Sequence, residues 1–143
     1  QLEDAYKNIE AHGYSSRISG FPINLLDHSI AYPKGFDIVW MSQFLDCFSQ
    51  EDIVELLKKA KAAISETGAV YIMETFWDNQ RTDAGRYSLV ATSLYFTCLA
   101  NGCSQMYHTH DMLNLIEKAG LKVAETYEKI GVSHTVLKCV PAE

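Results

Sequence analysis

The sequence lacks long hydrophobic runs, paired cysteines and clusters of basic residues. It contains no apolar stretch of about 18 residues, so it predicts no membrane-spanning helix, and no signal peptide is visible. The four cysteines are scattered without a CxxC pair, which is typical of reduced thiols in a cytosolic protein. The net charge is −6 and no basic run is present, which argues against a nucleic-acid surface. We therefore expect a cytoplasmic protein without a membrane or nucleic-acid partner.

The 143 residues are enough for one domain with a sizeable core. The chain starts at Gln1 and runs directly into a pattern typical of the middle of a helix. We interpret it as a piece of a longer protein.

The stretch Phe36–Asp52 organises the predicted fold. It opens with a short apolar run rich in β-favouring residues, which predicts a strand buried on both faces. Ser49 then begins a helix with acids in its first turn. Because ligands of open α/β sheets bind beyond the carboxyl ends of strands, the segment Ser42–Phe48 is the first candidate for a site.

Hydrophobic periodicity predicts helices alternating with strands along the rest of the chain. This order indicates an α/β fold with a doubly wound, mostly parallel sheet and a C-terminal antiparallel hairpin. The predicted helices are Leu2–Ile9, Ser49–Ile64, Asp83–Ala100 and Asp111–Ala119 with Thr109 as its cap, and the predicted strands are Arg17–Leu26, Phe36–Met41, Ala69–Phe76, Leu121–Ile130 and His134–Val140.

Three segments carry a resemblance to a known family: LDCFSQED (Leu45–Asp52), GAVYIMET (Gly68–Thr75) and LANGCSQMYHTHDMLNLIEKAGLKV (Leu99–Val123). Together with the final hairpin they resemble the C-terminal part of class I S-adenosylmethionine-dependent O-methyltransferases. The most similar group contains the plant caffeate-type and hydroxyindole-type enzymes and their bacterial relatives. The resemblance implies a partial Rossmann-like fold, S-adenosylmethionine as cofactor, a small aromatic or polyketide-like acceptor with a hydroxyl group, and a homodimer.

The family's glycine-rich cofactor loop, its ribose-binding acid and its N-terminal dimerisation domain have no counterpart in residues 1–143. We therefore expect the chain to be the distal part of a catalytic domain. Alone it is expected to bind cofactor poorly and to be inactive.

Two carboxylates are the candidate catalytic residues. The resemblance places Asp46 where the family has a catalytic His, and Cys47 where the family has the Asp beside it. Asp46 is either a general base, which burial would strengthen, or a cap of the following helix together with Ser49. Glu74 matches a family carboxylate that flanks the catalytic His, and its alternative is a structural partner for a backbone or Arg group.

The resemblance also implies which residues bind the two ligands. The cofactor is expected at the ends of two strands, and the acceptor on one helix, the loop after it and the turn of the final hairpin. His108 and His110 are too weak a pattern in a loop for a metal site, so no metal is expected. His134 is a second candidate for the base, and core packing is the alternative role for Leu25, Met41 and the aromatic residues. The cofactor-binding candidates are Asn24, Leu25, Met41, Ser42 and Gln43, and the substrate-binding candidates are Phe96, Asn101, Tyr107, His108 and His134.

Two other functions remain open at this stage. The departure from the family's His-Asp pair is compatible with an enzyme of different chemistry on the same scaffold. It is also compatible with a non-catalytic, methyltransferase-like interaction domain.

Overall fold

The computed structural model describes residues 2–142 of the chain. These residues form two compact units, one ending at Ile30 and the other beginning at Ala31. Each unit is described by itself.

The first unit contains one helix, α1 (Leu2–Ala11), which confirms the predicted N-terminal helix. The strand predicted over Arg17–Leu26 is wrong, because these residues form turns and irregular backbone. The N–H of Gly20 donates to the hydroxyl of Tyr6 at 3.1 Å rather than to a neighbouring strand. Pro22 has no N–H to donate, so the apolar residues around it do not build a ladder.

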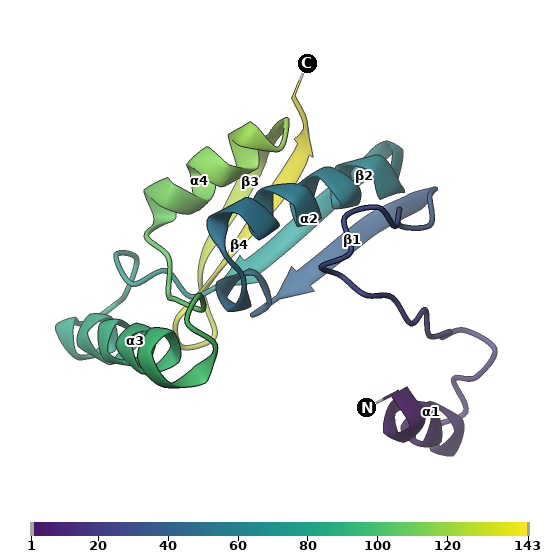
Figure 1. Ribbon diagram of the computed structural model, residues 1–143, viewed down its shortest axis with the longest axis horizontal. Helices are drawn as coiled ribbons and strands as arrows, with labels where there is room; N and C mark the ends of the chain where they lie inside the picture. Colours follow the sequence, from purple (N-terminus) through teal and green to yellow (C-terminus); the bar gives the residue numbers. More distant parts are fainter. Residues whose placement is uncertain (1, 143) are drawn as a thin grey trace. The chain divides into compact units, whose positions relative to one another are not determined.

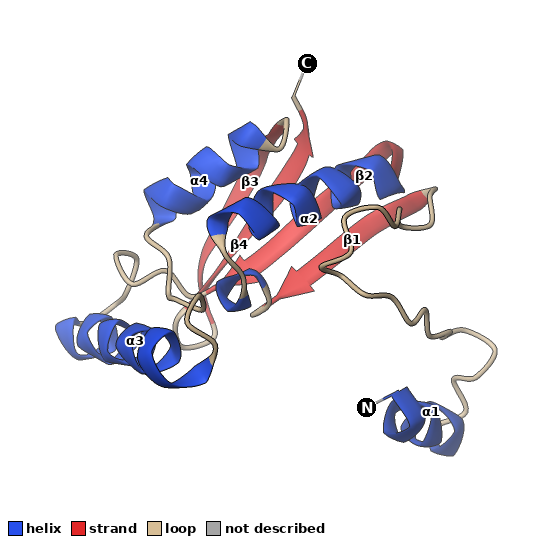
Figure 2. Cartoon of the chain, viewed as in Figure 1, coloured by secondary structure: helices blue, strands red, loops and turns tan. Residues whose placement is uncertain are grey.

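The second unit is built on a four-stranded sheet in the order β1-β2-β4-β3 (Figures 1 and 2). Its strands are β1 (Phe36–Ser42), β2 (Ile64–Glu74), β3 (Leu121–Ile130) and β4 (His134–Pro141). β1 and β2 pair in parallel, whereas β4 is antiparallel to both β2 and β3. The α/β fold and the closing antiparallel hairpin are therefore confirmed.

Two helices, α2 (Gln50–Ala63) and α4 (Thr109–Lys118), lie side by side on one face of this sheet (Figure 1). Ser49 caps α2 as predicted, since its Oγ accepts from the N–H of Asp52 at 3.2 Å. The fully buried side chains between helices and sheet are apolar, and such burial is the main favourable term in folding. They include Ile53, Leu56, Leu57, Ile72, Met112, Ile116, Leu121 and Leu137.

The prediction that β1 is buried on both faces is wrong. Ile38 is 57% exposed and Trp40 is 54% exposed. Within the described residues β1 pairs with β2 alone, so it is an edge strand, and no described helix covers the face that these two side chains share. The ring of Trp40 stacks on the ring of Tyr71 in β2, with the ring centroids 6.0 Å apart, and is partly covered by it.

The long helix predicted over Asp83–Ala100 consists of α3 (Asp83–Tyr95) followed by a π-helical turn, η2 (Phe96–Ala100). Thr82 caps α3 through its hydroxyl, which accepts from the N–H of Gly85 at 3.1 Å. Among the described residues, no helix is long and apolar enough to cross a membrane.

Candidate functional site

The carboxyl ends of β1 and β2 meet the start of β4 at one edge of the sheet. Ser42 pairs with Met73 in the parallel ladder, and Glu74 pairs with Thr135 in the antiparallel one. The residues that follow β1, that end β2 and that begin β4 therefore lie at the same edge (Figure 1). This edge is where α/β sheets bind ligands.

Gln43, the residue after β1, joins two of the predicted site residues. Its backbone has a φ of 45°, in the left-handed region that is uncommon for residues other than glycine. Its N–H donates to the carbonyl of Met73 at 2.8 Å. Its side-chain amide makes a hydrogen bond with Nε2 of His134, which begins β4. A predicted cofactor residue and a predicted substrate residue are thus in direct contact.

Glu74 is buried at the end of β2, with 3% of its surface exposed. Its Oε1 accepts hydrogen bonds from the N–H groups of Phe44 and Leu45, both at 2.9 Å. Burial raises the pKa of this carboxyl to about 7, since the loss of hydration outweighs the backbone hydrogen bonds that favour its charged form. Glu74 therefore anchors the turn after β1, as the structural alternative for this residue predicted.

Asp46 lies in that turn, a short 3-10 helix named η1 (Leu45–Cys47). Its carboxyl is half-buried, and burial raises its pKa. Its Oδ1 accepts from the thiol of Cys47 at 3.5 Å. The N-cap of α2 is Ser49, so the alternative role of Asp46 as a cap of this helix is wrong. A half-buried carboxyl with a raised pKa is a stronger general base than an exposed one.

The segment from Asn101 to Tyr107 holds the other side of η1. The side-chain amide of Asn101 donates to the carbonyl of Cys47 at 3.2 Å, and the hydroxyl of Tyr107 donates to the carbonyl of Phe48 at 2.9 Å. The N–H of Gln105 donates to the carbonyl of Asp46 at 2.9 Å. Two predicted acceptor-binding residues, Asn101 and Tyr107, are therefore brought to the turn that carries the candidate base.

The other two predicted acceptor residues lie at helix ends. His108 is the N-cap of α4, where its Nδ1 accepts from the N–H of His110 at 3.0 Å, so the prediction of Thr109 as the cap is wrong. The hydroxyl and N–H of Thr109 bind Asp78 instead, at 3.0 and 2.8 Å. Phe96 begins η2, with its ring 5.8 Å from that of Tyr95.

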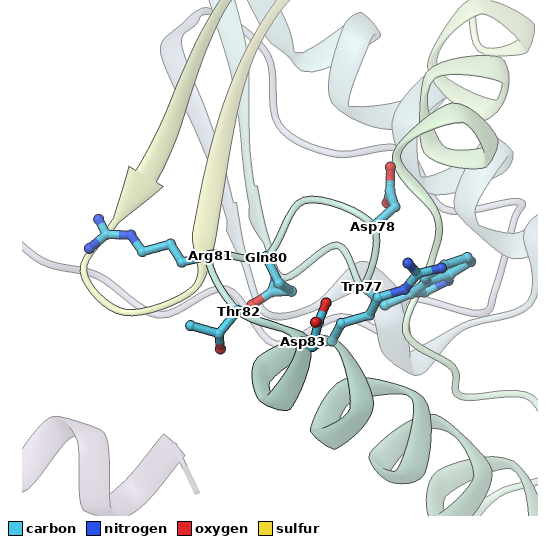
Figure 3. A pocket seen from close by; sticks show the side chains of 7 residues that line it. Trp77, Asp78, Gln80, Arg81, Thr82 and Asp83 are labelled. Carbon is cyan, nitrogen blue, oxygen red and sulfur yellow. The ribbon is translucent and has the colours of Figure 1, made fainter.

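A polar cavity of about 290 Å³ follows β2 and is absent from the sequence-based predictions (Figure 3). The guanidinium of Arg86 lies 5.1 Å from the centre of the Trp77 ring, which it covers. Arg81 points away from the other labelled side chains and donates to the carbonyl of Lys129 at 2.6 Å. An aromatic residue and two arginines within twelve residues of the end of β2 are the signal that the sequence offered. The cavity is lined by Trp77, Asp78, Gln80, Arg81, Thr82, Asp83 and Arg86.

The predicted cofactor residues are divided between the two units. Asn24 and Leu25 belong to the first unit, in which Oδ1 of Asn24 accepts from the N–H of Leu26 at 3.2 Å. Met41 is buried in the second unit, whereas Ser42 and Gln43 are exposed. Their convergence on one ligand stays a prediction. Among residues 2–142, no group of three or more His, Cys, Asp or Glu side chains could hold a metal ion.

Comparison with known proteins identifies the family. The family model described as the O-methyltransferase domain matches residues 12–122. The chain belongs to the O-methyltransferase family. A curated relative, the L-tyrosine C(3)-methyltransferase of Streptomyces lavendulae, is 30% identical over 126 residues, which are 87% of this chain and 32% of the relative. The chain thus spans about a third of the length of that relative.

Solved structures show the same fold. The mitomycin 7-O-methyltransferase MmcR superposes with a TM-score of 0.81 at 17% identity, over 98% of this chain and 39% of that one. The O-methyltransferase NcsB1 from neocarzinostatin biosynthesis, solved with S-adenosyl-L-homocysteine and 1,4-dihydroxy-2-naphthoic acid, gives a TM-score of 0.75 at 17% identity. That match covers 96% of this chain and 38% of NcsB1. The chain is therefore similar in fold to the C-terminal region of O-methyltransferases that use S-adenosylmethionine.

Proposed function

We propose that this chain is the distal part of a methyltransferase catalytic domain, which transfers a methyl group from S-adenosylmethionine to a hydroxyl of a small aromatic or polyketide-like acceptor. The observation that carries the proposal is the half-buried Asp46, held at the carboxyl edge of the sheet by Glu74 and by the Asn101–Tyr107 segment. The family to which the chain belongs supports the same chemistry. The predicted homodimer belongs to this proposal as well.

The predicted cofactor-binding residues fit the proposed cofactor in chemical type. The amide oxygen of Asn24 has two lone pairs and accepts one described hydrogen bond, which leaves capacity for the adenine amino group. Leu25 offers apolar surface and Ser42 offers an exposed hydroxyl at the carboxyl end of β1, whereas the amide of Gln43 is engaged with His134. When bound, S-adenosylmethionine supplies an electrophilic methyl group on a sulfonium centre.

Asp46 is the proposed proton acceptor for the hydroxyl group. Burial raises the pKa of Asp46, which brings it closer to the pKa of the hydroxyl group that it deprotonates. Glu74 acts through Asp46, because it fixes the N–H groups of the turn and not the acceptor. The proposed acceptor contacts are the flat ring of Phe96 and the polar groups of Asn101, Tyr107, His108 and His134.

Asp46→Asn tests the proposal in a protein that carries this chain together with the other segments that its relatives have. We expect kcat to fall by about 10²-fold or more, the range of general base catalysis, while calorimetric binding of S-adenosylmethionine is unchanged. Asp37→Asn, at an exposed position near the start of β1, is the matched control and should keep full activity. Binding without methylation of any phenol or naphthol in an acceptor panel would favour different chemistry on this scaffold. No binding at all would leave only an interaction domain.

A second candidate is methylation at a ring carbon beside the hydroxyl. The observation that favours it is the 30% identical relative, whose name describes methylation of L-tyrosine at C(3). The two reactions give isomeric products from the same phenol. The proton spectrum of the product separates them, since a methyl group on oxygen resonates apart from a methyl group on the ring.

A further inference from the structure

The side chains of Gln43 and His134 meet across 91 residues of sequence. We propose that Gln43 is a positioning residue that holds the proton of neutral His134 on Nδ1, and that this N–H group binds the oxygen of the acceptor. The inference rests on the proposed function, because it names the group that orients the acceptor hydroxyl for Asp46.

The backbone around Gln43 fixes this contact in place. A left-handed φ of 45° costs of order 1 kcal/mol and persists only where the surroundings determine it. Here the N–H of Gln43 is held by the carbonyl of Met73 at 2.8 Å, so the turn after β1 is tied to β2. His134 is held by the β2–β4 ladder, in which the neighbouring Thr135 pairs with Glu74. Both side chains therefore extend from rigid elements.

The chemistry of the amide selects the tautomer. The nitrogen of the Gln43 amide faces Nε2 of His134. An amide nitrogen only donates hydrogen bonds, so Nε2 must accept and the proton of the neutral ring must be on Nδ1. Within residues 2–142, Nδ1 of His134 has no hydrogen-bond partner. This N–H group on a half-buried ring at the ligand-binding edge is therefore left for a ligand.

A neutral N–H donor suits the oxygen of the acceptor. Asp46 removes the proton from that oxygen, and a hydrogen bond from Nδ1 stabilises the negative charge that develops there. His134 thereby contributes orientation and charge stabilisation, while the carboxylate of Asp46 takes the proton.

Nitrogen-15 NMR of the His134 ring tests the tautomer without cofactor or turnover. At a pH where the ring is neutral, we expect the bound proton on Nδ1 in the wild-type chain. Gln43→Ala should give a mixture of tautomers. Gln43→Glu should move the proton to Nε2, because a carboxylate accepts and does not donate. Gln50→Ala, at an exposed glutamine that begins α2, should leave the spectrum unchanged. A proton on Nε2 in the wild type, or the same tautomer in all variants, overturns the inference.

Kinetics in the longer protein provide the second measurement. We expect Gln43→Ala and His134→Ala to raise the KM for the acceptor by about 3- to 10-fold, the effect of one lost hydrogen bond, with the KM for S-adenosylmethionine unchanged. We also expect kcat to fall, because the charge that develops on the oxygen is less stabilised. A rise in the KM for S-adenosylmethionine alone would assign Gln43 to cofactor binding and overturn the inference. A tautomer that responds to Gln43 in a protein without methyl transfer would refute the proposed function and leave the pairing intact.

Discussion

The carboxylate of Glu74 accepts a hydrogen bond from the N–H of Leu45 at 2.9 Å, which joins the end of β2 to the turn that carries Asp46. A buried acid at this place acts on the site through the backbone. This effect requires no contact between Glu74 and a substrate, because the charge state of its carboxyl changes how firmly η1 is held.

The stability of the chain should fall as the pH rises from about 5 to 7. Burial raises the pKa of Glu74 from its usual 4.5 to about 7. In this window the unfolded carboxyl has lost its proton while the folded one keeps it, so each rise in pH favours the unfolded state. At about 1.4 kcal/mol per pKa unit, the free energy of unfolding drops by up to about 3 kcal/mol across the window.

Glu74→Gln should remove this slope while keeping the oxygen that accepts from Phe44 and Leu45. Urea denaturation at four pH values between 5 and 8 measures the slope in both proteins. A slope that persists unchanged in the variant would assign the pH dependence to other groups.

Tyr107→Phe should destabilise the chain by about 1–2 kcal/mol. The hydroxyl of Tyr107 donates to the carbonyl of Phe48 at 2.9 Å, and the residue is 4% exposed, so its loss leaves a carbonyl without its partner. Tyr87→Phe is the matched control, because Tyr87 is 77% exposed on α3 and should change stability by less than about 0.5 kcal/mol. Thermal unfolding of the wild type and the two variants measures both losses of stability. Equal losses would show that the Tyr107 hydroxyl does not hold the turn.

Two glycine substitutions should have opposite effects. A Cβ on Gly68 would lie 2.7 Å from the carbonyl oxygen of Phe36, where β1 and β2 approach each other. Gly68→Ala should therefore cost about 2 kcal/mol or more, since this oxygen belongs to the backbone and the strands must separate. A Cβ on Gly85 in α3 meets nothing closer than 3.4 Å. Gly85→Ala should stabilise the chain by about 0.5–1 kcal/mol through helix propensity. Denaturation midpoints measure both, and a loss at Gly85 like that at Gly68 would contradict the steric argument.

The sequence was informative where local chemistry decides structure. The apolar run from Phe36 to Met41, the cap at Ser49 and the closing hairpin all appeared where the patterns predicted them. The exposure of Trp40 was missed, since an apolar run predicts a strand but does not say which neighbours cover it. The segment from Arg17 to Leu26 was misread as a strand because its apolar residues mask the effect of Pro22.

The site was predictable in part for the same reason. The end of β1 was the expected location, and Asp46 and Glu74 lie there together. The pairing of Gln43 with His134 was not predicted, because it depends on the register between β2 and β4. The cavity beside Trp77 depends likewise on how Arg86 of α3 folds over the ring.

The thiol of Cys47 should react slowly with iodoacetamide and should report on Asp46. Its pKa is raised to about 11 by desolvation first and then by the neighbouring negative charge of Asp46 and their hydrogen bond. Alkylation requires the thiolate, so the rate at pH 8 should be far below that of an unperturbed thiol. Asp46→Asn removes the charge and should speed the reaction by about 3- to 10-fold, because one pKa unit is a tenfold change in thiolate.

The rate is best followed by mass spectrometry in a chain that keeps Cys47 and has serine at the exposed Cys98 and Cys103, since Cys139 is buried. Glu51→Gln, an exposed acid in the first turn of α2, is the matched control and should leave the rate unchanged. An identical rate with Asp46 or Asn at position 46 would show that the carboxylate does not face the thiol. The hydrogen bond between this thiol and Asp46, which raises the pKa of Cys47 and lowers the pKa of Asp46, would then be absent.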